Sequence, residues 1–182
     1  MFYELQVKSH VRVPPNNIGK NYEEAIKERL NTDFEGYISQ EIGYIISIKE
    51  IVNIGEGIII SGDPGIHFET EFKVLTLIPE NQEIILGTIS DITNFGAFIN
   101  LGPTDGMIHV SQTMDDFISF SKNKTLTGKE TKQVLKVDDK CRARIIAISY
   151  KDLNNPKIAL TMRQPLLGNL NWLKEKKKKT KK

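Results

Sequence analysis

The sequence predicts an α+β protein in which a β-α-β-β-β domain precedes a small five-stranded Greek-key barrel. One observation is length, because 182 residues allow two small cores. A second is a helical pattern near the N-terminus with β-rich runs after it. A third is charge: residues 1–80 carry 7 basic and 13 acidic side chains, whereas residues 81–173 carry 11 and 9. We expect domains at residues 1–80 and 81–165, followed by a C-terminal segment at 166–182.

The first domain is expected to open with a strand and a helix. The strand covers Phe2–Val13 and ends at Pro14-Pro15, because proline cannot continue a sheet ladder. Asn21 has the chemistry of a helix N-cap, and Gly36 is suited to end the helix. The apolar residues at helical spacing on one side are Tyr22, Ala25, Ile26 and Leu30.

Three further strands are expected in the first domain. Tyr44–Ile54 is rich in β-branched residues, and Gly55-Glu56-Gly57 predicts a hairpin turn into a strand over Ile58–Ile60. A second turn over Ser61–Gly65 leads to the last strand, His67–Ile78. One face of that strand, at period two, comprises Phe68, Thr70, Phe72, Val74, Thr76 and Ile78.

The second domain begins after a short linker, Pro79-Glu80-Asn81. Five strands are expected in this domain. A long polar segment, Ser119–Lys136, lies between the third and the fourth strand. Five short strands with one long insertion suit a Greek-key barrel. The strands are expected over Gln82–Ile92, Asn94–Leu101, Gly106–Val110, Cys141–Ser149 and Lys157–Met162.

Composition excludes several classes of protein. Hydrophobic residues make up 39% and charged residues 26%, and we expect a cytoplasmic protein with no signal peptide, no membrane contact and no transmembrane segment. The single Cys141 and three scattered histidines imply neither a disulfide framework nor a metal, and no cofactor is implied. The pairs Asp115-Asp116 and Asp138-Asp139 do not suit catalysis, because adjacent side chains diverge. The lysine tail is either a solvated extension or an auxiliary phosphate contact.

Phe95, Phe98 and His109 are the candidate nucleic-acid-binding residues, because exposed rings on neighbouring strands stack on unpaired bases. Strict alternation would put Phe95 in the core and Phe98 on the other face. A bulge at Gly96 would instead bring both rings onto one outer surface. Periodicity alone leaves these alternatives open. For His109 the pattern favours exposure, since its two neighbours are apolar and suit the core face.

The stretch Gly87–Ser111, together with Cys141–Ile145 and Lys157–Arg163, resembles the RNA-binding OB repeat first described in the large S-one protein of the small ribosomal subunit. Phe95, Phe98 and His109 stand where that repeat presents its RNA-facing aromatics and histidine, so the resemblance favours the bulged alternative. We expect stacking to be combined with phosphate contacts, which makes binding sensitive to salt. The residues expected to contact phosphates are Arg142, Arg144 and Arg163, the last of which could instead brace the barrel.

Features of both domains, in order, resemble the E-prime family of archaeal RNA polymerase stalk subunits; they are Val11–Pro15, Gly19–Leu30, Gly55–Phe72 and Ala159–Pro165. The resemblance implies a truncated RNP-like first domain that docks on the polymerase core near the clamp, with the smaller F subunit of the RNA polymerase along both domains as a heterodimer partner. It implies a non-catalytic role in initiation, elongation and termination, with nascent single-stranded RNA bound by the barrel. The docking tip corresponds to Gly62, Asp63, Pro64, Gly65, Ile66 and His67.

Two other functions are compatible with an OB repeat. One is a free-standing RNA chaperone or translation factor. The other is the accessory RNA-binding part of an exonuclease, which would need a catalytic partner chain. Neither function gives the acidic first domain a specific role.

Overall fold

The computed structural model of the chain describes residues 1–17, 21–121, 123–152 and 156–173. The chain forms two compact units, the first covering Met1–Ile78 and the second beginning at Pro79. Each unit has its own core of buried apolar side chains. The lysine-rich tail lies outside the described residues.

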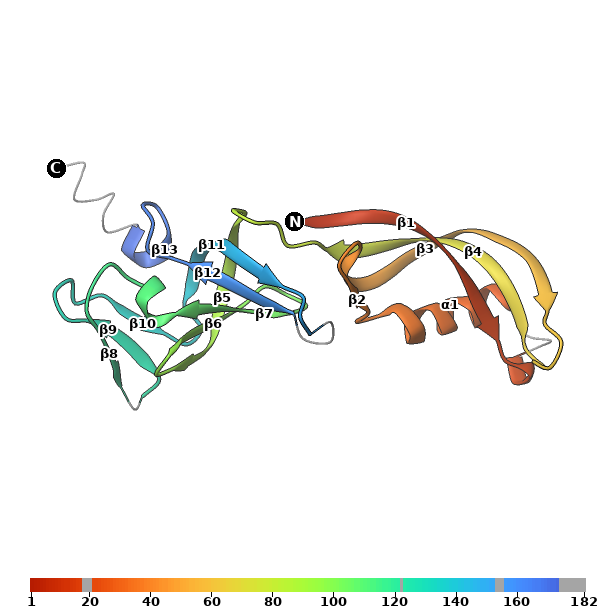
Figure 1. The fold of residues 1–182 in the computed structure, drawn as a ribbon, viewed down its shortest axis with the longest axis horizontal. Helices are drawn as coiled ribbons and strands as arrows, with labels where there is room; N and C mark the ends of the chain where they lie inside the picture. Colours follow the sequence, from red (N-terminus) through yellow and green to blue (C-terminus); the bar gives the residue numbers. More distant parts are fainter. Residues whose placement is uncertain (18–20, 122, 153–155, 174–182) are drawn as a thin grey trace. The chain divides into compact units, whose positions relative to one another are not determined.

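The first unit is a four-stranded antiparallel sheet with one helix packed on it (Figure 1). The strand order is β1-β4-β3-β2. In chain order its elements are β1 (Phe2–Val13), the short 3-10 helix η1 (Pro15–Asn17), α1 (Tyr22–Phe34), β2 (Ile38–Ser39), β3 (Gly43–Ile59) and β4 (Ile66–Leu77).

The helix and the last strand of this unit agree with the sequence prediction. The Asn21 side chain accepts a hydrogen bond from the backbone N–H of Glu23, and Gly36, just after the helix, has a φ of 77°. The predicted apolar face of α1 is buried at Ala25, Ile26 and Leu30. On β4 the buried face contains Phe68, Thr70, Phe72, Val74 and Thr76. Apolar burial between this face and the helix therefore holds the unit together.

The predicted hairpin at Gly55-Glu56-Gly57 is wrong. Strand β3 continues through these residues, and Ile58 and Ile59 pair with β4 as part of the same strand. Between the pairs Tyr44–Leu77 and Ile59–Ile66, β3 uses four more residues than β4, which correspond to four register shifts. Each bulge inserts one residue and increases the local twist, so the glycines mark the last bulge of a curved strand and not a turn.

The second unit contains the predicted five-stranded barrel. Its strands are β5 (Ile84–Thr93), β6 (Gly96–Asn100), β7 (Asp105–His109), β11 (Lys140–Ser149) and β12 (Lys157–Thr161). They pair in the order β12-β7-β6-β5-β11, and a further β12–β11 pairing closes the barrel. Only the β12–β7 pair is parallel among the barrel strands of the described residues. The 3-10 helix η2 (Val110–Gln112) follows β7.

The expected polar segment contains a small sheet that the sequence did not reveal. Strands β8 (Ile118–Ser121), β9 (Thr125–Gly128) and β10 (Val134–Lys136) pair in the order β10-β9-β8. Leu126 and Leu135 from this sheet are fully buried in the barrel core. Because apolar residues are sparse in this segment, its polar loops obscured the period-two pattern.

Residues after 165 also belong to the barrel. Strand β13 (Gly168–Asn169) pairs with β11, and Trp172 packs against the barrel core. The described part of the expected C-terminal segment is therefore an extension of the second unit. Among the residues that the structure describes, no helix has the length and apolarity required to cross a membrane.

Candidate nucleic-acid interface

Phe95 and Phe98 lie together at one end of the barrel. Phe95 occupies the turn between β5 and β6, and Phe98 lies on β6. Their ring centroids are 6.1 Å apart at an interplanar angle of 89°, an edge-to-face arrangement that aromatic pairs prefer. The Phe95 side chain is 47% exposed, and its backbone oxygen accepts a hydrogen bond from Val110 N at 2.9 Å. The turn therefore holds an exposed ring next to a strand ring.

The two rings meet, but not through the bulge predicted at Gly96. Pairing of β6 with β7 is unbroken from Gly96 to Asn100, and the bulge lies in β5 between Ile89 and Asp91. Phe95 lies in the turn before β6, so the alternation of side chains between the two faces of a strand does not apply to it. A Cβ on Gly96 would lie 2.2 Å from the backbone oxygen of Ile108, so this position needs glycine for close strand approach.

His109 lies on the same outer surface of the barrel. It pairs with Gly96 across β6 and β7, while Met107 pairs with Phe98. Directly opposite residues share a face, and Ile108 is fully buried, so His109 and Met107 point outwards with Phe98. The His109 Nδ1 atom is 2.8 Å from Ser111 Oγ and accepts a hydrogen bond from Ser111 N, which orients the imidazole. We call Phe95, Phe98, Met107 and His109 the platform.

A carboxylate beside the platform is neutralised by a lysine. Asp91 on β5 pairs with Phe98, and its Oδ1 atom lies 2.7 Å from Lys124 Nζ. The hydrogen bond from Lys124, followed by one from the backbone N–H of Ile92, lowers the pKa of Asp91. The ion pair therefore reduces the repulsion that a free carboxylate would exert on a phosphate.

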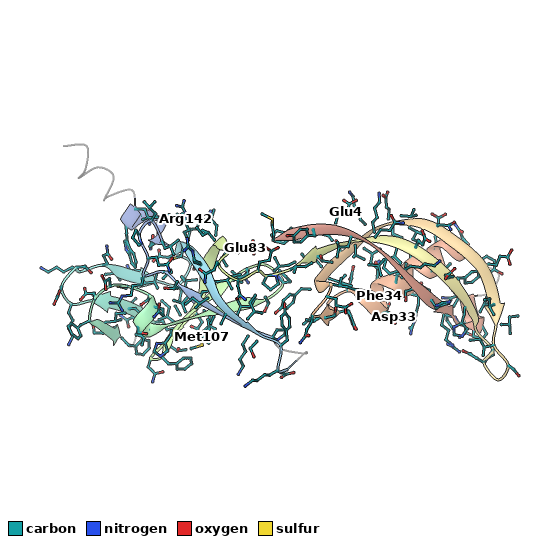
Figure 2. The ribbon with its side chains drawn as sticks, turned by 45° about the horizontal axis from the view of Figure 1, so that its top comes forward. Glu4, Asp33, Phe34, Glu83, Met107 and Arg142 are labelled. Atoms are coloured by element: carbon teal, nitrogen blue, oxygen red, sulfur yellow. The ribbon has the colours of Figure 1, made fainter. Side chains whose placement is uncertain are left out.

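One of the predicted arginines, Arg142, lies away from the platform. Arg142 and Arg144 are on the outer face of β11, where they pair with Leu86 and Ile84 of β5. Leu86 is five positions from Asp91 along β5, which corresponds to about 16 Å at the usual strand rise. Figure 2 shows Arg142 and the platform residue Met107 on different sides of the barrel.

Arg144 and Arg163 meet in a separate open pocket of about 520 Å³. Arg144 Nε is buried and makes no hydrogen bond to the described residues. Arg163 Nε donates to Asp115 at 2.8 Å, and Arg142 donates to the backbone oxygen of Leu166 at 3.3 Å. The remaining pocket residues are Gln82, Gln112, Ile146, Thr161, Gln164 and Pro165. This pocket offers donors to an anion, but it is not part of the platform.

In the first unit, Asp63 organises the predicted tip. Its carboxylate accepts hydrogen bonds from Arg12 Nε at 2.7 Å and from the backbone N–H of Gly65 at 3.0 Å, and it lies 2.9 Å from His67 Nε2. The hydrogen bond from Arg12 is the largest of the causes that hold the pKa of Asp63 far below its usual value. Gly62 has a φ of 90° in this turn, a conformation that glycine adopts without strain. The tip is therefore bonded to β1.

Sequence reasoning missed an apolar surface beside this tip. Ile58, Ile59 and Ile60 are 56%, 73% and 50% exposed. The signal in the sequence is a run of isoleucines before a polar turn, which the residue pattern alone does not distinguish from an ordinary strand. Contiguous exposed apolar residues at the end of a sheet are typical of a protein-binding surface.

The two units match known domain families in sequence. Residues 8–64 match the SHS2 domain found in the N terminus of Rpb7p/Rpc25p/MJ0397. Residues 78–155 match the S1 RNA binding domain. A sheet-and-helix domain of this kind, followed by an S1 barrel with exposed rings, defines a two-domain RNA polymerase subunit of the stalk type.

Full-length relatives identify the family more closely. The chain is 36% identical to DNA-directed RNA polymerase subunit Rpo7 of Saccharolobus solfataricus over 98% of this chain and 100% of that one. It is 35% identical to Rpo7 of Sulfolobus acidocaldarius over 96% of each chain. DNA-directed RNA polymerase II subunit 7 of Arabidopsis thaliana is 23% identical over 94% of this chain and 97% of that one. The chain belongs to the Rpo7 family.

Proposed function

We propose that this chain docks on the core of DNA-directed RNA polymerase through its first domain and holds emerging single-stranded RNA on its barrel. In this function the chain is non-catalytic, and nucleotide addition takes place in other subunits. The proposal is supported by membership of the Rpo7 family, whose members are named as polymerase subunits. As a component of the polymerase, the chain is located in the cytoplasm in this proposal.

The observation that carries RNA binding is the side-by-side placement of Phe95, Phe98 and His109 on one outer surface of an S1-type barrel. Each base stacked on such a ring contributes about 1–3 kcal/mol, and every base offers a face for stacking. Binding is therefore tolerant of sequence. Such tolerance suits a polymerase component that receives whatever transcript emerges.

Arg142, Arg144 and Arg163 serve as a second set of phosphate contacts in this proposal. Arg142 lies away from the platform, so only an RNA longer than the platform reaches it. Arg144 and Arg163 support this role, because both line the same open pocket. These contacts make the affinity for longer RNA more sensitive to salt.

Docking on the polymerase is assigned to the tip, Gly62–His67, together with Ile58, Ile59 and Ile60. The isoleucines supply apolar area, and Asp63 holds the adjacent turn in one conformation. A preorganised apolar surface loses little entropy on binding. We also propose a heterodimer with the smaller F subunit of the polymerase, and roles of the assembled stalk in initiation, elongation and termination.

The other functions compatible with an OB repeat are not favoured. A free-standing chaperone, a translation factor or an exonuclease accessory subunit would share the barrel alone. The relationship to Rpo7 instead extends over 98% of the chain and includes the first domain.

Co-purification of the tagged full-length chain with its polymerase tests this function. We expect the chain to form a one-to-one complex with the F subunit and to transfer with it onto the core. Ile59→Asp places a charge on the apolar tip, so it should abolish transfer to the core while RNA affinity is retained. Leu86→Asp is the matched control, because Leu86 is similarly exposed on the barrel. A wild-type chain that does not co-purify with the polymerase would refute the proposal.

A further inference from the structure

The sheet formed by β8, β9 and β10 exposes two aromatic rings that the proposed function does not use. Phe117, just before β8, is 74% exposed, and Phe120 on β8 is 44% exposed. Ile118 packs against the barrel core, as Leu126 and Leu135 do. The sheet is therefore anchored by its aliphatic residues. Phe120 pairs with the buried Leu126 and shares its core-facing side, whereas Phe117 remains available to a ligand.

The same sheet is basic. Among the residues that the structure describes, the exposed lysines between β8 and the end of β10 are Lys124, Lys129, Lys132 and Lys136. Glu130 is the acidic residue among them. Asp116, beside the sheet, accepts hydrogen bonds from the backbone N–H groups of Thr131 and Glu130, which contribute to lowering its pKa. Lysines interspersed with exposed rings suit a ligand that carries both phosphates and bases.

The position of the sheet makes it a continuation of the platform. The β8–β9 turn carries Lys124, whose ion pair with Asp91 joins it to β5 at the residue opposite Phe98. At the other end of β8, the backbone oxygen of Phe117 accepts a hydrogen bond from Lys129 N at 2.9 Å. From Phe98, the surface therefore continues past Lys124 along β8 to Phe117 and Lys129.

We propose that the β8–β10 sheet is a second binding surface for the same single-stranded RNA that occupies the platform. The strand passes Lys124, stacks a base on Phe117, and places phosphates against Lys129 and Lys132. This inference rests on the proposed RNA binding by the platform. Charge favours RNA over a protein as the occupant, because these lysines attract a chain with a phosphate at every nucleotide.

Length-dependent RNA binding by the full-length chain tests the inference. OB-fold sites cover about 4 to 16 nucleotides, so homopolymeric single-stranded RNAs of about 4 and about 16 nucleotides are compared. Phe117→Ala should weaken binding of the long RNA about tenfold and leave the short RNA unaffected. Phe2→Ala, which removes an exposed phenylalanine from the first unit, is the control.

The lysines are tested by the salt dependence of the same binding. The double variant Lys129→Gln and Lys132→Gln should reduce the slope of log affinity against log salt by about 1.4 for the long RNA, since each single-strand phosphate contact contributes about 0.7. The slope for the short RNA should not change. Lys27→Gln, on α1 of the first unit, provides a control for the loss of an exposed charge.

Different failures have different meanings. Unchanged affinity of the Phe117 variant for the long RNA would overturn the inference while short-RNA binding still supports the platform. A wild-type chain that binds neither RNA would overturn both the inference and RNA binding by the platform. Loss of polymerase co-purification by the Phe117 variant, with both RNA affinities retained, would show that the sheet binds protein and would overturn the inference.

Discussion

Gly96 lies directly opposite His109 across β6 and β7, and the backbone of the neighbouring Ile108 leaves no room for a side chain at Gly96. This close approach places the imidazole of His109 beside the β5–β6 turn that carries Phe95. The platform therefore depends on a backbone contact as well as on its rings. The residue that permits this contact is the glycine between the two phenylalanines.

Gly96→Ala should destabilise the barrel by about 1–3 kcal/mol, because the added methyl group overpacks against a backbone oxygen that cannot move aside freely. Thermal or denaturant unfolding measures the loss. Asn94→Ala, on the exposed side of the same turn, should have little effect. Equal stabilities of the Gly96 variant and the wild type would contradict the close approach of β6 and β7.

The free energy of unfolding at acidic pH should depend on the ionisation of Asp63. Its folded-state pKa lies below the ordinary value of 3.8, mainly because of the hydrogen bond from Arg12. The stabilisation is therefore present above that ordinary value and is lost as pH falls through the folded-state pKa. Carboxyl titration by NMR should show the lowered value, and Arg12→Gln should raise it. Arg29→Gln, which removes an ion pair within α1, should leave the titration of Asp63 unchanged.

The single thiol should be unreactive in the folded protein. Cys141 is fully buried, and this burial, with a smaller effect of Asp139, raises its pKa to about 12 from an ordinary 9.0. Thiol labelling at neutral pH should therefore proceed only on unfolding, because the thiolate is the reactive form. Stability should decrease as pH rises from the ordinary pKa towards the folded-state value. A Ser119→Cys variant supplies an exposed thiol for comparison, and rapid labelling of native Cys141 would refute its burial.

The pattern of apolar and polar residues was sufficient to predict the two cores. It was not sufficient to predict where the strands bulge or turn. The period-two face of β4 and the helical face of α1 were predictable because each buries one side against a core. At Gly55 and Gly57 the residues suit a turn or a bulge equally, and only pairing with the intact β4 distinguishes them. The same ambiguity applies at Gly96, where glycine serves close approach and the turn frees Phe95 from alternation.

The candidate site was predictable in part for a similar reason. Phe95, Phe98 and His109 lie close in sequence on adjacent strands, so local pairing brings them together. Arg142 of β11 comes from a distant segment, and it lies on another side of the barrel from Met107. The exposure of Ile58–Ile60 and of Phe117 depends on where the sheets end, which composition does not specify.

The most direct test of RNA binding by the platform is the affinity of Phe98→Ala for a short single-stranded RNA, measured by fluorescence anisotropy. Removing this ring should weaken binding about tenfold or more, while Phe98→Tyr, which keeps a ring for stacking, retains it. Polymerase co-purification should remain unchanged in both variants, and thermal unfolding verifies that each barrel is folded under the conditions of the binding measurement. An affinity of Phe98→Ala equal to that of the wild type would contradict the platform as the RNA-binding surface.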